Sequence, residues 1–187
     1  MPPDAAADRF AIPTERLILR PWREADHGAL LAICQDPRVM EFLGPPQTEA
    51  EVHAAIGRLR LCQADNGYCF WAVERREDGA VLGFCGLKPG QPETPIAGRV
   101  EIGWRLAADA WGQGFAREAA LASLDWGWAN LDVRDIWAIT APGNVRSWGL
   151  MERLGMTRHH DMDFIFPGMP ADSPVSQCIT YSIGRPA

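Results

Sequence analysis

The sequence has no uninterrupted apolar stretch of about 18 residues, and its first ten residues, MPPDAAADRF, carry acidic residues and no apolar run. A membrane-spanning helix needs about 20 apolar residues, and a secretory signal needs an apolar core. We therefore expect no membrane partner and a cytoplasmic location. Residues 1–13 are expected to form a flexible tail and residues 14–187 a single domain, a length sufficient for one hydrophobic core.

Cysteine pairs at metal-binding or redox spacing are also absent. The sequence has five cysteines, an odd number, without a Cys-x-x-Cys motif or a Cys/His cluster: Cys34, Cys62, Cys69, Cys85 and Cys178. The adjacent His159 and His160 would point to opposite faces of a strand and could not easily share one ion. We expect free thiols in a reducing compartment and no metal site.

A basic block is missing as well. The chain carries 18 Lys and Arg residues against 24 Asp and Glu residues, for a net charge of −6. Nucleic-acid binders follow phosphates with clustered cations, so no nucleic-acid partner is expected. An acidic surface suits a cationic substrate such as an amine, although it equally serves solubility.

The sequence does contain alternating strand and helix patterns. Strands are predicted over residues 14–22, 68–75, 81–87, 99–106, 136–140, 157–162 and 178–183, and helices over residues 24–35, 48–64, 116–131 and 144–154. Thr48 and Glu51 form a capping-box pattern, and Asp78-Gly79 between apolar runs predicts a hairpin. Gly103 inside a strand suggests a bulge or a close backbone approach. These elements predict an α/β (α+β) domain of about seven strands and four helices.

The clearest of these helices, residues 116–131, has Leu121, Leu124, Trp128 and Leu131 at heptad-like spacing. Such spacing predicts that these four side chains form its apolar face.

A glycine-containing loop precedes this helix. Gly112 and Gly114 would let the backbone approach a phosphate, which the free N–H groups and dipole of the helix N-terminus would attract. A dinucleotide fingerprint is excluded because Arg117 stands where a small residue is needed, and no Gly-Lys-Ser/Thr of a P-loop occurs. A plain tight turn before a helix remains the alternative at this point.

The segments VEIGWRL, WGQGFAREA and NVRSWGLMERLGM, in this order, strongly resemble the GNAT superfamily of N-acetyltransferases. The opening TERLILRPW resembles the RimJ/RimL (ribosomal-protein alanine acetyltransferase-like) branch, and the resemblance covers about Thr14 to Met156. It implies a mixed, mostly antiparallel central sheet, splayed between the fourth and fifth predicted strands. It also implies acetyl-CoA as co-substrate and no metal.

By this resemblance the pyrophosphate of coenzyme A would bind the loop through main-chain N–H groups. The residues so implied are Gly112, Gln113, Gly114, Phe115, Ala116 and Arg117, with Trp111 replacing the usual Gln or Arg. The pantetheine arm would lie in the splay beside Trp104, Arg105 and Leu106 and contact Asn144, which is also a suitable helix N-cap.

The expected chemistry needs a neutral amine, because only that form attacks a thioester. Glu101, in the EIG segment, is the candidate base, acting through water, with a purely structural carboxylate as the alternative. Asp163 is a lower-ranked acid on the substrate side, with a solvated loop charge as its alternative. Met151 stands where many members have a tyrosine that protonates the thiolate, so Ser147, one turn after Asn144, is the candidate donor to sulfur.

The sequence thus predicts an N-acetyltransferase that transfers acetyl directly to a primary amine in a ternary complex. The acceptor could be a protein N-terminal α-amine, a polyamine or amino acid, or an aminoglycoside, and the protein a monomer or homodimer. A non-catalytic acyl-CoA-binding or sensing module of the same fold is the alternative, and another nucleotide-binding protein is a third.

Overall fold

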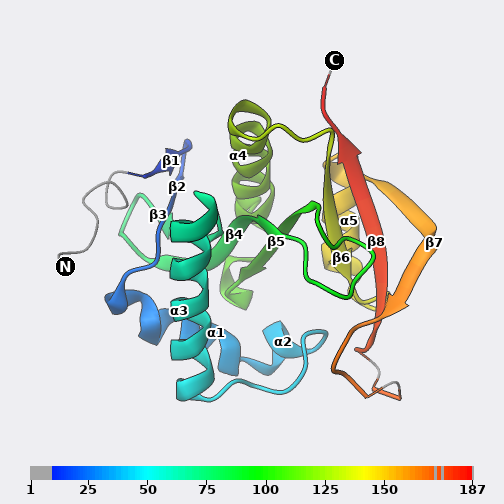
Figure 1. Cartoon of the computed structure of the whole chain (residues 1–187). Helices are drawn as coiled ribbons and strands as arrows, with labels where there is room; N and C mark the ends of the chain where they lie inside the picture. The colour runs from blue at the N-terminus through cyan, green and yellow to red at the C-terminus, as the bar shows by residue number, and fades with distance from the viewer. Residues whose placement is uncertain (1–9, 171, 174, 187) are drawn as a thin grey trace.

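The computed structural model describes residues 10–170, 172–173 and 175–186, which form one mixed sheet with helices on both faces (Figure 1). The eight strands are β1 (Ile12–Pro13), β2 (Leu17–Arg20), β3 (Phe70–Arg75), β4 (Val81–Pro89), β5 (Val100–Leu106), β6 (Asp135–Thr140), β7 (Thr157–Ile165) and β8 (Gln177–Gly184). The helices are α1 (His27–Gln35), α2 (Pro37–Met40), α3 (Glu49–Asn66), α4 (Phe115–Asn130) and α5 (Val145–Arg153). Short 3-10 turns, η2 (Glu24–Asp26) and η3 (Ala108–Ala110), precede α1 and follow β5.

The strands run in the order β1-β2-β3-β4-β5-β6-β8-β7, and neighbours are antiparallel except for the parallel pair β5–β6. The expected mixed, mostly antiparallel sheet is therefore confirmed. The sequence missed one strand and one helix, because β1 has two residues and α2 has four. Elements this short carry too little periodicity to be detected.

The beginning of the chain corrects the expected tail. Ile12 pairs with Leu19 across the β1–β2 ladder, and the Phe10 ring stacks on Trp71 with the ring centroids 5.0 Å apart. Ile12 and Pro13 therefore belong to the sheet, and Phe10 packs against it, within the tail that was predicted over residues 1–13. The remainder of that prediction, residues 1–9, lies outside the described residues.

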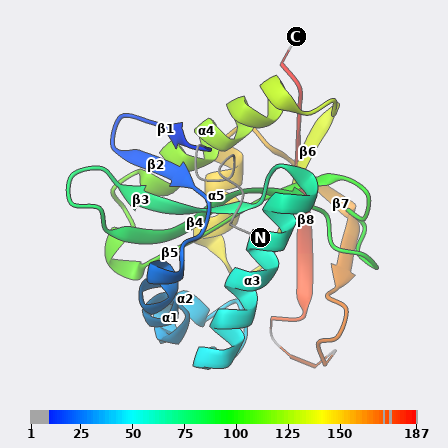
Figure 2. The same ribbon diagram turned by 60° about the vertical axis from the view of Figure 1, so that its left-hand side comes forward.

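The helices divide between the two faces of the sheet. Helices α4 and α5 pack on one face, whereas α1, α2 and α3 lie on the other (Figures 1 and 2). Residues Val100, Ile102 and Leu106 of β5 pack in the core under α4. Because side chains alternate along a strand, Glu101, Gly103 and Arg105 face the opposite side, toward α1.

The buried face of α4 differs from the predicted stripe. Leu121 is exposed, whereas Ala119, Ala120, Ser123, Leu124 and Gly127 are buried against the sheet. A Cβ atom at Gly127 would lie 2.7 Å from Leu87 Cδ1 and 3.0 Å from Ile136 Cδ1. Of the predicted stripe, Leu124 is buried and Trp128 and Leu131 pack against the core, so the prediction fails only at Leu121. The small residues that bring the helix close to the sheet are not detected by a search for large apolar side chains.

Strands β5 and β6 separate soon after they meet. Val100 pairs with Ile136 and Glu101 with Trp137, and no further β5–β6 pair occurs among the residues that the structure describes. Strand β5 continues for five residues beyond Glu101, to Leu106, bonded to β4 alone. The expected splay between these two strands is confirmed.

Candidate active site

The loop between β5 and α4 reaches the helix through two glycines in the left-handed region. Gly112 has φ +73° and Gly114, the N-cap of α4, has φ +82°, a conformation that side chains with a Cβ rarely adopt. A Cβ atom at Gly112 would meet nothing within 4 Å, so the loop is open on that side. The buried Phe115 ring anchors the first turn of the helix in the core.

The main-chain N–H groups of this loop point to a binding role. Among the described residues, none of the N–H groups from Gly112 to Arg117 donates a hydrogen bond to a protein acceptor. The next N–H, that of Glu118, already bonds to the Gly114 carbonyl at 3.0 Å. Free N–H groups at the positive end of a 16-residue helix form a site for an anionic group, and this arrangement fits a pyrophosphate.

Arg16 holds the loop and was missed by the sequence analysis. Its Nη1 donates to the Gln113 carbonyl at 3.0 Å, and its Nη2 lies 2.6 Å from the Glu118 carboxylate. The guanidinium also lies 4.5 Å from the centroid of the Phe115 ring. Arg16 and Glu118 are 102 residues apart in the chain, so no local pattern could have indicated the contact.

The splay leaves main-chain groups of β5 without a strand partner. The Ala107 N–H bonds to the Leu82 carbonyl, so the antiparallel alternation directs the N–H and C=O of Trp104 and Leu106 away from β4. Trp111 Nε1 donates to the Leu106 carbonyl at 2.9 Å, which leaves the Trp104 groups facing the splay.

Arg105, predicted together with these residues to bind the coenzyme, has a different position. The same alternation directs its main-chain groups toward β4. Its side chain lies on the α1 face, where Nη1 is 3.1 Å from Cys34 Sγ and the guanidinium is 5.3 Å from the centroid of the Phe84 ring. Its side chain is thus on the face of the sheet opposite α4.

Glu101 lies where β5 and β6 separate, on the same face as Arg105. It is 7% exposed, and Oε2 accepts a hydrogen bond of 2.5 Å from Lys88 Nζ on the neighbouring strand. Burial raises the pKa of the Glu101 carboxyl, and the Lys88 ammonium opposes that rise. A buried carboxylate with a raised pKa is suited to accept a proton near neutral pH.

Other side chains surround Glu101 on this face. Trp137 is its cross-strand partner. The Arg99 guanidinium lies 3.9 Å from the centroid of the Trp137 ring, and the His159 ring lies 4.9 Å from it between centroids. His159 Nε2 also lies 2.7 Å from Ser182 Oγ. Burial, and then the charge of Glu101, raise the pKa of Cys178 to about 11, so its sulfur is a thiol rather than a nucleophilic thiolate at neutral pH.

Helix α5 brings the other predicted residues to the splay from the opposite face. Asn144 is its N-cap, and Oδ1 accepts the Ser147 N–H at 3.3 Å. Ser147 lies one turn before the buried Met151, on the inward side of the helix, and its hydroxyl has no hydrogen-bond partner among the described residues. Met151 offers no proton donor, so Ser147 supplies the hydroxyl of this helix face.

Asp163 does not occupy the loop in which the sequence analysis placed it. It lies within β7, which extends to Ile165, and its carboxylate is 2.5 Å from Arg158 Nη2. The β7–β8 register shifts between His159 and Phe164, where four β7 residues lie between the paired positions and obscure the alternation in sequence.

The five cysteines are free thiols, and four of them are buried. Within the described part of the chain, no group of three or more His, Cys, Asp or Glu side chains is arranged to hold a metal ion. No helix in that part is long and apolar enough to span a membrane.

Comparisons with known proteins point to one family. A family profile described as an acetyltransferase (GNAT) domain matches residues 16–157. The uncharacterized protein YkkB of Bacillus subtilis is 31% identical over 144 residues, which cover 76% of this chain and 83% of YkkB.

Two solved structures share the fold. An acetyltransferase from Agrobacterium tumefaciens has a TM-score of 0.75 and 27% identity, covering 93% of this chain and 94% of its own. A spermidine N-acetyltransferase from Vibrio cholerae, in complex with CoA and spermine, has a TM-score of 0.70 and 18% identity, covering 92% and 97% of the two chains. At that identity the second likeness concerns the fold alone.

Proposed function

This chain belongs to the GNAT acetyltransferase family, and we propose that it transfers acetyl from acetyl-CoA directly to a primary amine, as a member of the RimJ/RimL-like branch. The observation that carries the proposal is the set of free main-chain N–H groups from Gly112 to Arg117 at the N-terminus of α4. GNAT enzymes use acetyl-CoA, whose pyrophosphate is the kind of anion that such a helix terminus binds.

The coenzyme would be held by the chain at three places. The N–H groups of residues 112–117 would hold the pyrophosphate, the main chain of Trp104 would bond to the pantetheine arm, and Asn144 Nδ2 would donate to the same arm. Supporting this, the N–H groups of residues 112–117 and Asn144 Nδ2 have no hydrogen-bond partner among the described residues, and the main-chain groups of Trp104 point away from β4. When bound, acetyl-CoA supplies the activated acyl carbon that an amine attacks.

We assign the proton transfers to two side chains. Glu101 would accept the proton of the attacking amine through water, because its raised pKa and its place at the splay suit a base. Ser147 would donate a hydrogen bond to the coenzyme sulfur, since its hydroxyl lies on the inward face of α5 one turn before Met151. Asp163, already paired with Arg158, is a subordinate candidate on the substrate side.

The acceptor would be a protein N-terminal α-amine or a small-molecule amine. An α-amine with a pKa of about 7.8 is about 15% neutral at pH 7, whereas a lysine amine is about 0.04% neutral. Glu101 is therefore more important for the second kind of acceptor. We infer a cytoplasmic enzyme that acts as a monomer or homodimer.

The proposal is tested by replacing Gly114 with Glu. A carboxylate in the anion site should lower the affinity for CoA by about 100-fold or more, because it repels the pyrophosphate and occupies the N–H groups. Calorimetric titration with CoA measures the affinity, and CoA-thiol release over a panel of amines measures transfer. Gly79→Glu, at φ +73° in the exposed β3–β4 turn, is the matched control and should bind CoA normally. Unchanged affinity in Gly114→Glu would contradict the loop assignment.

A further inference from the structure

The Arg105 side chain carries a charge that the described protein does not neutralise. Its Nε is buried and has no hydrogen-bond partner among the described residues, and no carboxylate in that part of the chain lies within 4.0 Å of its guanidinium. Nη1 contacts only the weakly accepting Cys34 sulfur, and the Phe84 ring provides a cation–π contact. These contacts replace little of the hydration that a guanidinium loses on burial.

Other buried or partly buried cations of the chain are paired with carboxylates. Arg20 lies 2.8 Å from Asp26, Lys88 lies 2.5 Å from Glu101, and Arg158 lies 2.5 Å from Asp163. Each of these cations has a carboxylate to offset its desolvation, as burial of charge requires. Arg105 has none, although it lies in a protein with a net charge of −6 and six more acidic than basic residues.

Arg105 also lies in one row with the proposed base. Three cross-strand pairs follow one another on this face of the sheet, namely Lys88↔Glu101, Gly86↔Gly103 and Phe84↔Arg105. Neither glycine has a side chain, and the Phe70 ring lies over Gly103, where its Cζ would be 2.6 Å from a Cβ atom. At about 3.3 Å per residue, the Cα atoms of Glu101 and Arg105 are about 13 Å apart.

From this row we propose that Arg105 binds a carboxylate of the acceptor, whose amine is placed at Glu101. The face offers a base at one end, an aromatic ring in the middle and an uncompensated guanidinium at the other end. The substrate class is therefore an amine that also carries a carboxylate about 10 Å away, such as a short peptide, rather than a polyamine. This inference rests on the proposed function, because it concerns the acceptor side of the same site.

Guanidinium–carboxylate bonding is the chemistry expected here. Arg can present two parallel N–H donors to a carboxylate, and a hydrogen bond to a charged group contributes about 1.5–3 kcal/mol, which is about 10- to 100-fold in binding. An extended tripeptide separates its terminal amine from its carboxylate by about 10 Å. The flexible Arg105 side chain can adjust for the remaining difference.

The test uses dialanine, trialanine and tetraalanine, each as the free acid and as the C-terminal amide. Wild-type kcat/KM should favour the acid over the amide by about tenfold or more at the length that fits best. Arg105→Gln should lower kcat/KM for that acid by about 10- to 100-fold, mainly through KM, and leave the amide within about twofold. Arg105→Lys keeps the charge but loses the paired donors, so its kcat/KM for that acid should lie between the values of wild type and Arg105→Gln.

Arg38→Gln is the control for net charge, because Arg38 is exposed and already paired with Asp36. A second measurement does not need turnover. N-acetyl-trialanine, but not its amide, should raise the melting temperature of CoA-saturated wild type, and Arg105→Gln should lose this effect. Lack of acetyl transfer to any amine would refute the proposed function alone, since the melting experiment still judges Arg105.

Two results would overturn the inference. The first is an equal loss of kcat/KM for acid and amide in Arg105→Gln and Arg105→Lys, which would indicate a purely structural role. The second is a wild type that distinguishes acid from amide neither in turnover nor in melting temperature.

Discussion

Glu101, the proposed base, is a buried carboxylate that forms an ion pair with Lys88. Burial raises the pKa of Glu101, while the Lys88 ammonium at 2.5 Å favours the ionised form. The two effects act in opposite directions, so the ammonium determines how much of the carboxylate is available as a base at a given pH. Lys88 is a positioning residue in this account, because it acts on the reaction through Glu101.

Lys88→Met should therefore move the acidic limb of the pH–rate profile to higher pH. Loss of the ammonium removes the effect that lowers the pKa of Glu101, so the carboxyl stays protonated, and inactive as a base, over a wider range. The measurement is the ratio of variant to wild-type kcat/KM across pH with one amine, since the ionisation of the amine cancels in the ratio. The ratio should be low in acid and rise toward a constant value as pH increases.

Glu101→Gln supplies the control for this experiment. It should lower kcat/KM by about 10²- to 10⁴-fold, the usual contribution of a general base, and leave CoA affinity unchanged. If the ratio of Lys88→Met to wild-type kcat/KM did not change with pH, the acidic limb of the profile would reflect the ionisation of a group other than Glu101. Glu101 would then be the structural carboxylate that the sequence left open as its alternative role.

Helix α5 is an element in which one residue has two separable tasks. Asn144 Oδ1 caps the helix by accepting the Ser147 N–H, and Nδ2 is the donor proposed to hold the coenzyme. An aspartate keeps the acceptor but has no donor when ionised, and it is as good an N-cap as asparagine. Stability and coenzyme binding can therefore be measured apart at this position.

Asn144→Asp should retain the wild-type free energy of unfolding within about 0.5 kcal/mol but raise KM for acetyl-CoA about tenfold. Asn144→Ala should raise KM similarly and also lose about 1 kcal/mol of stability, because the cap is removed. Urea unfolding and steady-state kinetics provide the two measurements. If Asn144→Asp kept the wild-type KM, Asn144 would serve only as a cap.

An element could be predicted from the sequence where the residues that determine it lie close together along the chain. Helix α3 begins after Thr48, whose capping box with Glu51 is present, and the Asp78-Gly79 turn joins β3 to β4 as expected. These features depend on residues within four positions of one another. The inward face of α4 was predicted in part: Leu124, Trp128 and Leu131 pack on the core, but Leu121 does not. The small residues of that face were missed, including Gly127, which allows a close approach that a larger residue would prevent.

The same distinction applies to the candidate site: its contiguous loop could be predicted, but its long-range contacts could not. The loop before α4, to which coenzyme binding is proposed, is a contiguous segment, so its glycines could be identified from sequence, and Gly112 and Gly114 both have positive φ. The contact of Arg16 with Glu118 and the absence of a carboxylate beside Arg105 depend on strand order and register. No local sequence pattern contains that information.

At the scale of the whole molecule, a buried ion network connects β2 and β3 to the turn that leads into α1. Arg20 donates to both oxygens of Asp26 at 2.8 Å and, through Nε, to Glu74 on β3 at 2.6 Å. Asp26 also accepts the Arg23 N–H, which fixes the turn that enters α1. Since α1 carries Cys34, the network also positions the helix that covers Arg105.

Asp26→Asn should lower the free energy of unfolding by about 3 kcal/mol at pH 7. Breaking a buried pair costs about 3–5 kcal/mol, and Glu74 still partners Arg20, which favours the lower end. Burial alone would raise the pKa of Asp26, but the Arg20 and Arg23 hydrogen bonds outweigh it and lower the pKa. This contribution to stability is therefore present above the unfolded pKa of about 3.9 and is lost as pH falls through the folded value.

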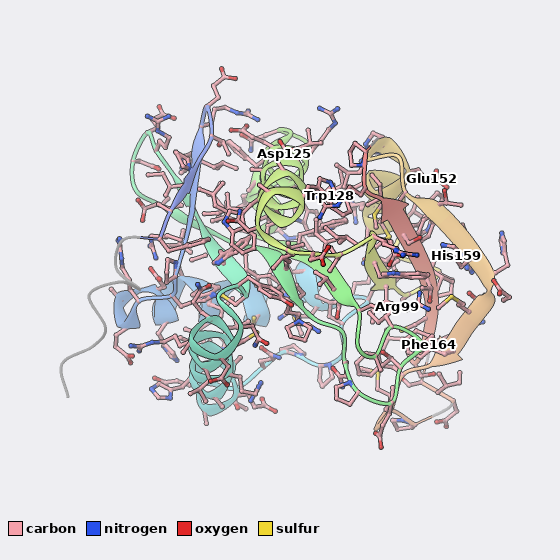
Figure 3. All side chains as sticks on the ribbon, turned by 45° about the horizontal axis from the view of Figure 1, so that its top comes forward. Arg99, Asp125, Trp128, Glu152, His159 and Phe164 are labelled. Carbon is pink, nitrogen blue, oxygen red and sulfur yellow. The ribbon has the colours of Figure 1, made fainter. Side chains whose placement is uncertain are left out.

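The difference between wild type and Asp26→Asn should accordingly shrink as pH is lowered from 5 toward 2, because wild type loses what the variant already lacks. Urea unfolding at a series of pH values measures it. Asp125→Asn, on the exposed side of α4 (Figure 3), is the matched control and should stay within about 0.5 kcal/mol of wild type throughout. A wild-type advantage over Asp26→Asn that stayed constant down to pH 2 would mean that packing, rather than the charge of Asp26, holds α1 against the sheet.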